Sequence, residues 1–143
     1  MNFLRLLIVL SAMLLASMAA QAETHEDRFK RINAVAHPAF PAGTQGYELF
    51  WVEPGDPGSA VETLSSVLAA AKRQRARWVV ASDDAEALTS TLMAVFARAE
   101  GSRRIRTQIV LVSPLSENAA LEDAAKRVGA ALEFRVLPPP PQA

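Results

Sequence analysis

Residues 78–88 read Trp-Val-Val-Ala-Ser-Asp-Asp-Ala-Glu-Ala-Leu, and this stretch decides the fold. Its first four residues form a continuous apolar run, which is typical of a strand that is buried on both faces. Asp83, followed three residues later by Glu86, forms a capping box and predicts that a helix begins directly after the strand. A buried strand that leads into a helix is the repeating unit of a parallel α/β sheet.

The same unit recurs on both sides of this stretch. Strands are predicted wherever short apolar or alternating runs stop at turn-forming residues, at 47–53, 78–81, 109–112 and 132–136. Helices are predicted between them from apolar residues at helical spacing, at 59–71, 83–100 and 121–128. Ser59 with Glu62 supplies a capping box for the first helix, and Gly129 supplies a C-cap for the last. The last strand alternates apolar with charged side chains, which indicates an edge strand.

This order predicts a small three-layer, Rossmann-like α/β domain over residues 47–137, with four mostly parallel strands and three right-handed crossover helices. The helices are expected on both faces of the sheet. Periodicity does not determine strand order, and 2-1-3-4 is our working hypothesis. A short helix, beginning at Thr24, and an irregular connector are expected over residues 23–46. The proline-rich residues 138–143 are expected to form a disordered tail.

Residues 1–22 have the features of a cleavable signal peptide. Arg5 supplies the positive start, an apolar run follows, and Ala20-Gln21-Ala22 matches the small-x-small cleavage pattern. The apolar run is shorter than the roughly 18–20 residues that span a bilayer, so we expect cleavage after Ala22 and no transmembrane segment in the mature chain. The predicted location is the periplasm or the extracellular medium.

Composition argues against several kinds of function. The chain has no cysteine, which excludes disulfides, thiolate metal sites and cysteine redox chemistry. Its 15 basic residues balance its 15 acidic ones, so it lacks the dominant positive field of a nucleic-acid-binding protein. It contains neither G-x-G-x-x-G nor G-x-x-x-x-G-K-[ST], so a dinucleotide or nucleoside triphosphate has no glycine-rich phosphate cradle. We expect no nucleic-acid partner and no resident cofactor.

Basic residues gather after the predicted helices, where the chain enters the amino-terminal ends of the strands. We name this set the basic rim; it comprises Lys72, Arg73, Arg75, Arg77, Arg103, Arg104 and Arg106. Basic side chains near helix C-termini stabilise the helix dipole by about 0.3–1 kcal/mol each, and this alone would explain the pattern. Alternatively, the basic rim docks an acidic partner protein or an anionic lipid surface. Both interpretations stay open.

Acidic residues follow the predicted strands at the opposite end, where ligands of open α/β sheets bind. Asp56, Asp83 and Asp84 are candidate groups for a ligand or a divalent cation, since hard cations prefer several carboxylate oxygens. The competing interpretation is that these residues cap helices and favour the helix dipoles. A serine hydrolase is disfavoured, because His25 and His37 both precede the predicted sheet.

Cleavage after Ala22 would place His25 third in the mature chain, behind Glu23 and Thr24. The terminal amine, two deprotonated amides and the imidazole could then supply four nitrogens in a plane, which suits Cu(II) or Ni(II). The arrangement resembles the amino-terminal copper-binding motif of unrelated extracellular proteins. The resemblance covers three residues only. It predicts that the processed chain binds Cu(II) or Ni(II) adventitiously in solution.

Two hypotheses about function follow. The sequence contains no complete catalytic constellation, while the basic rim and the tail offer surfaces for contacts. The first hypothesis is an exported, non-enzymatic domain that binds another protein of the cell envelope as an accessory or inhibitory factor. The second is a small metal-assisted hydrolase or ligand-binding protein that uses Asp56, Asp83 and Asp84.

Overall fold

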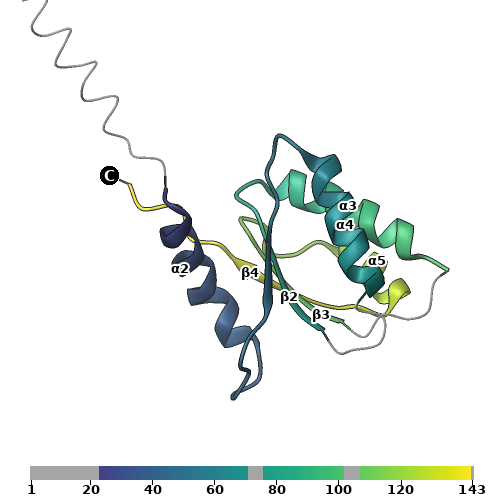
Figure 1. Cartoon of the computed structure of the whole chain (residues 1–143), viewed down its shortest axis with the longest axis horizontal. Helices are drawn as coiled ribbons and strands as arrows, with labels where there is room; N and C mark the ends of the chain where they lie inside the picture. Colours follow the sequence, from purple (N-terminus) through teal and green to yellow (C-terminus); the bar gives the residue numbers. More distant parts are fainter. Residues whose placement is uncertain (1–22, 71–75, 102–106, 143) are drawn as a thin grey trace, which may run out of the picture.

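The computed structural model describes residues 23–70, 76–101 and 107–142. Its strands are β1 (Glu48–Trp51), β2 (Ala76–Ala81), β3 (Thr107–Ser113) and β4 (Ala131–Val136). Its helices are α2 (His25–Ala36), the 3-10 helix η1 (His37–Ala39), α3 (Pro57–Ala70), α4 (Ala85–Ala99) and α5 (Ala119–Val128). All strand pairs are parallel, which confirms the predicted α/β class and its three-layer, Rossmann-like arrangement (Figure 1).

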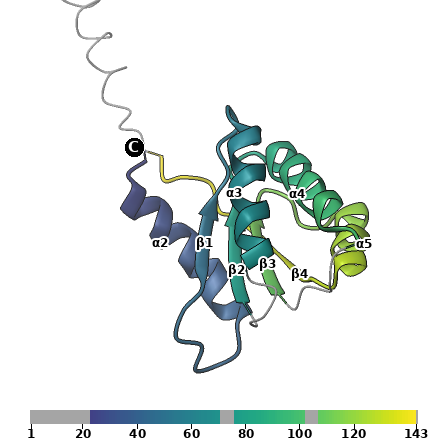
Figure 2. The ribbon, with the colours of Figure 1, turned by 45° about the vertical axis from the view of Figure 1, so that its right-hand side comes forward.

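The strands lie in the order β1-β2-β3-β4, so the hypothesis of a 2-1-3-4 order is wrong. Right-handed crossovers that all step in the same direction place their helices on the same face. Accordingly, α3, α4 and α5 cover one face of the sheet, and α2 covers the other (Figure 2). Burial gives the physical reason: β2 and β3 are almost wholly buried, as central strands must be, whereas β1 is partly exposed and suits an edge.

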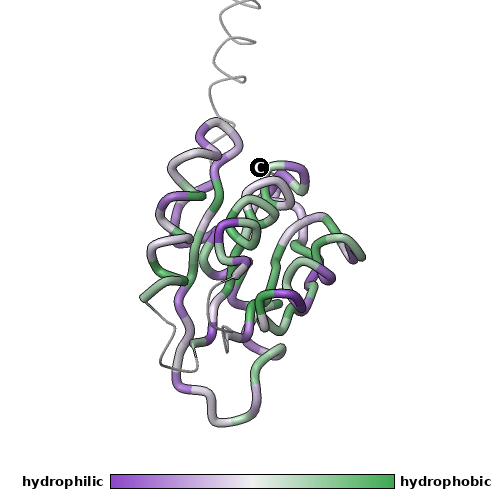
Figure 3. Tube along the Cα trace, turned by 90° about the vertical axis from the view of Figure 1, so that its right-hand side faces the viewer, coloured by the Kyte–Doolittle hydropathy of each residue, from purple (hydrophilic) through white to green (hydrophobic). Residues whose placement is uncertain are grey.

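The larger part of the core lies between the sheet and helices α3, α4 and α5. It joins alternate residues of β2 and β3 to the apolar sides of these helices: Trp78, Val80, Ile109, Leu111, Leu64, Leu68, Leu88, Leu92, Phe96, Leu121 and Val128. Each of these side chains is at most 4% exposed, and burying one contributes roughly 1.5–3 kcal/mol. This burial matches the hydropathy of the chain, since the strands are apolar along most of their length (Figure 3).

A second cluster of buried side chains lies on the opposite face, under α2. It joins the intervening residues of β2 and β3 to α2, to the residue after η1 and to the segment after β4: Val79, Ala81, Val110, Val112, Ile32, Ala36, Phe40 and Leu137. Successive strand residues point to opposite faces, so a strand covered on both sides must be apolar without a break. The N-terminal helix therefore forms one of the three layers of the fold.

Two predicted helix boundaries are confirmed. The Thr24 side chain accepts a hydrogen bond from the Asp27 amide at 3.1 Å and caps α2. Gly129 has a φ of 85°, and its amide bonds to the carbonyls of Ala125 and Lys126 at the end of α5. This left-handed conformation favours glycine, as the C-cap prediction required.

Two other predicted caps are wrong by one to three residues. The cap of α4 is Asp84, whose carboxylate accepts from the amides of Glu86 and Ala87 at 3.0 Å each. α3 begins at Pro57, and Asp56 accepts from the Ser59 amide at 3.1 Å. Proline at the first helical position fixes a suitable φ and has no amide to leave unpaired, which explains the earlier start.

The predicted signal peptide, residues 1–22, lies outside the described residues. Within the described ranges, none of the helices combines the length and apolar character that crossing a membrane requires. Residues 138–142 continue from β4 without regular secondary structure and are exposed.

Candidate functional site

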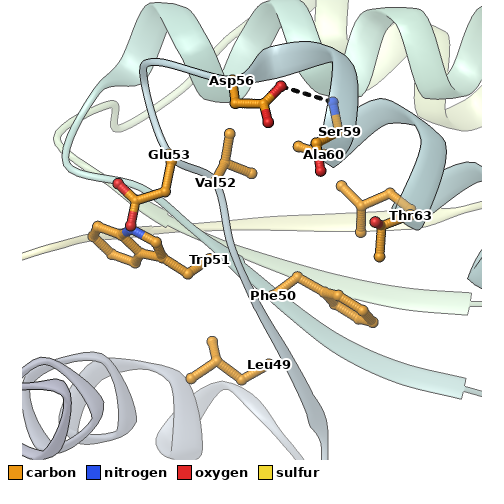
Figure 4. Close-up of a pocket in the computed structure, with 10 residues that line it drawn as sticks. Leu49, Phe50, Trp51, Val52, Glu53, Asp56, Ser59, Ala60 and Thr63 are labelled. Atoms are coloured by element: carbon orange, nitrogen blue, oxygen red, sulfur yellow. Dashed lines mark hydrogen bonds between the residues drawn. The ribbon is translucent and has the colours of Figure 1, made fainter.

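A groove of about 310 Å³ lies beside β1, between this strand and α3 (Figure 4). Residues 49–53 form one wall, and the exposed side of α3 forms the other with Ser59, Ala60 and Thr63. Phe50 points toward α3, whereas Leu49 points toward α2 (Figure 4). The groove therefore places a mostly apolar strand opposite small and hydroxyl-bearing side chains.

The outer edge of β1 offers unused backbone hydrogen-bonding groups. The Val52 amide bonds to the Ala81 carbonyl at 2.9 Å, and the Ser82 hydroxyl donates to the Val52 carbonyl at 2.9 Å. Because backbone groups alternate in direction along a strand, those of Leu49 and Trp51 face away from β2. No described strand pairs with that side of β1. A row of unpaired N–H and C=O groups of this kind is a template for another strand.

The two ends of this edge are acidic. Glu48 begins β1 and is exposed, and Glu53 follows it with 63% of its side chain exposed. Asp56 lines the same end of the groove as Glu53. The strand residues between these acids are uncharged.

The opposite edge of the sheet is different in character. β4 carries Glu133 and Arg135 within the strand, and their side chains form an ion pair at 2.5 Å. Charged residues within an edge strand disfavour the addition of another strand. The edge of β1, by contrast, carries no charged side chain between Glu48, its first residue, and Glu53, which follows it.

The three candidate cation ligands have separate structural partners. Asp56 and Asp84 cap α3 and α4, while Asp83 accepts hydrogen bonds from Arg31 at 3.1 and 3.2 Å. Across the described ranges, no group of three or more His, Cys, Asp or Glu side chains is arranged to hold a metal ion. Asp56 and Asp84 therefore act as helix caps, as the competing interpretation has it, whereas Asp83 forms an ion pair in place of the predicted cap.

Arg31 is the central residue of an ion-pair cluster at the carboxyl ends of the strands, and sequence reasoning missed it. Its side chain is 7% exposed, and its Nε and Nη2 donate to the two carboxylate oxygens of Glu23 at 2.7 and 2.8 Å. Its Nη1 also donates to the Pro138 carbonyl at 2.7 Å. The Arg31 hydrogen bond holds the pKa of the Glu23 carboxyl below its ordinary value of 4.5, against the opposing effect of burial.

A second arginine of α2 lies over the sheet. The Arg28 guanidinium carbon lies 4.2 Å from the centre of the Trp51 ring, within the range of a cation–π interaction. Arg28 also lies 3.5 Å from Glu23 and 3.7 Å from Glu53. These contacts fix the side of β1 that faces α2 and leave the groove side open.

The strand-end serines have structural roles. Ser82 is buried, donates to the Val52 carbonyl and accepts from the Asp84 amide at 3.1 Å. Ser113 is buried and accepts from the Leu115 amide at 3.1 Å. Both hydroxyls shape the turns after their strands.

The predicted Cu(II) motif adopts a helix-capping conformation. Thr24 has a ψ of 158°, which places the amide nitrogens of Thr24 and His25 on opposite sides of the Thr24 backbone. A chelate ring through both nitrogens requires them on the same side, with ψ near zero. Binding of a metal ion by all four nitrogens therefore requires Thr24 to leave its capping conformation, which breaks its hydrogen bond from the Asp27 amide.

Arg77 is the one member of the basic rim that lies within the described residues. Arg77 lies at the second position of β2 and is exposed. The other members, Lys72, Arg73, Arg75, Arg103, Arg104 and Arg106, lie outside the described residues.

Comparison with protein-family models, with curated proteins and with solved structures gave no match for this chain.

Proposed function

We propose that this chain is an exported, non-enzymatic binding domain, and that it recognises an extended segment of another protein by adding it as a fifth strand beside β1. The observation that carries the proposal is the groove along the unpaired edge of β1. Main-chain hydrogen bonds supply the affinity in this mode of recognition, and pockets beside the strand supply the specificity.

The acidic ends of the edge indicate the chemistry of the partner. A bound segment with basic residues flanking an apolar centre would meet Glu48 at one end and Glu53 with Asp56 at the other. Such charge complementarity gives specificity and speeds association.

The same charges argue against a second copy of this chain as the occupant. Antiparallel pairing of two β1 edges brings the Glu48 end of one copy beside the Glu53 end of the other. Acidic residues would then meet at both ends, and like charges across paired strands are destabilising. A different protein with basic residues fits the edge better.

Peptide titration of the full mature chain tests the proposal. The probe is Arg-Thr-Val-Thr-Val-Thr-Arg, with Glu-Thr-Val-Thr-Val-Thr-Glu as the charge-reversed control. We expect the basic peptide to bind with a Kd of about 0.1–1 mM and the acidic peptide at least about tenfold more weakly. Methylation of every central amide nitrogen of the basic peptide should abolish binding, since it removes the donors of the added strand.

Two tryptophan variants localise the binding. Thr63→Trp fills the groove from α3, whereas Ser66→Trp adds the same ring at another exposed position of that helix. Binding lost in Thr63→Trp and kept in Ser66→Trp supports the proposal. Equal binding by both variants, or no binding of any extended peptide, contradicts it. Self-association that depends on the β1 edge, detected by sedimentation, would identify a second copy as the occupant and overturn the proposal of a different partner.

A further inference from the structure

A second cavity, of about 300 Å³, lies on the other side of β1, between α2 and the connector that leads into the sheet. Phe29 and Asn33 line it from α2, and His37 lines it from the start of η1; their four-residue spacing places the three on one side of this helical segment. Connector residues 44–46, with Tyr47 and Leu49, complete the lining. Only Leu49 also lines the groove beside α3.

The charge of this cavity differs from that of the groove. None of the described residues that line it is an aspartate, glutamate, lysine or arginine. His37 is the one histidine of the lining, so an anion would meet no lysine or arginine there and a cation would meet no carboxylate. The chemistry of the lining therefore favours an uncharged ligand.

The polar groups of the cavity can both donate and accept hydrogen bonds. The Tyr47 hydroxyl donates a hydrogen bond to Oδ1 of Asn33, which fixes the orientation of the amide and leaves its Nδ2 as a donor. The Gln45 amide and the His37 ring bond to no described residue. Burial raises the pKa of Tyr47 above its ordinary value of 10.0, so its hydroxyl stays protonated. A ligand with several hydroxyl or amide groups matches this set.

The cavity also offers an apolar surface. Phe29 is 49% exposed, and Val136 is the other large apolar residue of the described chain with comparable exposure. Tyr47 stacks on Phe40, with ring centres 5.2 Å apart, so its ring is held in place. Aromatic rings bury a large area against a flat apolar partner.

We propose that this cavity binds one uncharged pyranose unit of a glycan. A pyranose combines an apolar face of C–H groups, which would lie on Phe29, with hydroxyls around its edge, which would bond to Asn33, Gln45 and Tyr47. This site is independent of strand addition at β1: it uses different side chains, apart from Leu49, and a ligand of another class.

Titration of the ¹⁵N-labelled mature protein tests this site. The probes are cellobiose, maltose, xylobiose and N,N′-diacetylchitobiose, together with glucose and glucuronic acid as a pair that differs in one carboxylate. At least one disaccharide should shift the amide signals of Asn33, Gln45 and Tyr47 in a saturable manner, with a Kd of about 1–10 mM. Glucuronic acid should bind at least about tenfold more weakly than glucose, since no lysine or arginine lines the cavity to pair with its carboxylate.

Matched variants separate the site from a general surface effect. Phe29→Ala should weaken disaccharide binding at least about tenfold, whereas Val136→Ala, at the other exposed apolar residue, should leave it unchanged. Both positions are exposed, so both variants should keep the spectrum of the folded protein. No saturable shift with any disaccharide up to about 50 mM overturns the proposal. So does equal binding by Phe29→Ala, or saturation by N-acetyltyrosine amide alone, which would identify an aromatic peptide side chain as the ligand.

Discussion

Arg31 and Glu23 meet face to face: Nε and Nη2 of the arginine donate to the two carboxylate oxygens of the glutamate at 2.7 and 2.8 Å. Both side chains are at least nine-tenths buried. Bidentate pairs of this kind are among the strongest hydrogen-bonded contacts in proteins. The pair joins the first described residue of the chain to the middle of α2.

Loss of the Glu23 charge should destabilise the fold. We expect Glu23→Gln to lower the free energy of unfolding by about 2 kcal/mol, because it weakens two charge-assisted hydrogen bonds to a buried arginine. Urea unfolding of a chain that comprises residues 23–143 measures the effect. Glu26→Gln is the matched control, since Glu26 pairs with Lys30 at the surface, and it should cost less than about 0.5 kcal/mol. Similar losses in both variants would contradict a special role for Glu23.

The same carboxyl should contribute to acid sensitivity. Arg31 lowers the pKa of Glu23 in the folded protein, below its ordinary value of 4.5. A carboxyl with a lowered folded pKa contributes stability that is present above its unfolded pKa and is lost as pH falls through the folded value. We therefore expect the stability difference between the wild-type protein and Glu23→Gln to be constant above about pH 5.5 and to shrink toward pH 3. A difference that does not change with pH would contradict this linkage.

Substitution of Asp84 separates a cap from a metal ligand. Asp84→Ala should lower stability by about 1 kcal/mol, and Asp84→Asn should keep most of it, because asparagine caps helices as well as aspartate does. The unfolding temperature should not respond to Ca²⁺, Mg²⁺ or Mn²⁺ in either variant or in the wild-type protein. A cation-dependent rise in the wild-type protein that Asp84→Asn removes would restore the hypothesis of a metal site.

In a chain that begins at Glu23, Cu(II) should bind only if the N-terminal cap of α2 is lost. The chelating conformation of Thr24 and His25 removes a helix cap worth about 1 kcal/mol, so affinity should be about fivefold below that of a free peptide with the same three residues. Because the unfolded chain carries no such cost, Cu(II) should lower the unfolding temperature of the wild-type protein and leave His25→Ala unaffected. A rise in unfolding temperature with Cu(II) would contradict the structural argument.

Local patterns predicted the elements of this fold well, and the reason is physical. Residues 78–81 and 109–112 are apolar without a break because α2 covers one side of them and α3 to α5 cover the other. Helical spacing and the left-handed Gly129 likewise leave direct marks in the sequence. Strand order leaves no such mark, because it depends on which strands meet after long crossovers. The one available signal is the pair of acids within the predicted strand 47–53, Glu48 and Glu53, which suit an edge.

The sites were harder to predict for a related reason. The groove arises where β1 meets α3, and no spacing rule identifies an unpaired strand edge. The acids after the strands were visible in the sequence, but Arg31, the partner of Asp83, lies 52 residues away. The residues that line the second cavity are spread over the predicted short helix and connector of residues 23–46 and the predicted strand at 47–53, and only the packing of α2 brings Phe29 and Asn33 beside Tyr47.

The bond from Arg31 to the Pro138 carbonyl joins residues 107 positions apart. Leu137, which follows β4, belongs to the cluster under α2. If the chain is exported N-terminus first, α2 emerges well before β2, β3 and Leu137, against which it packs. The packing of α2 would then be completed only after residues 137 and 138 have left the translocation channel, so this layer of the fold would stay open while the preceding residues are transported.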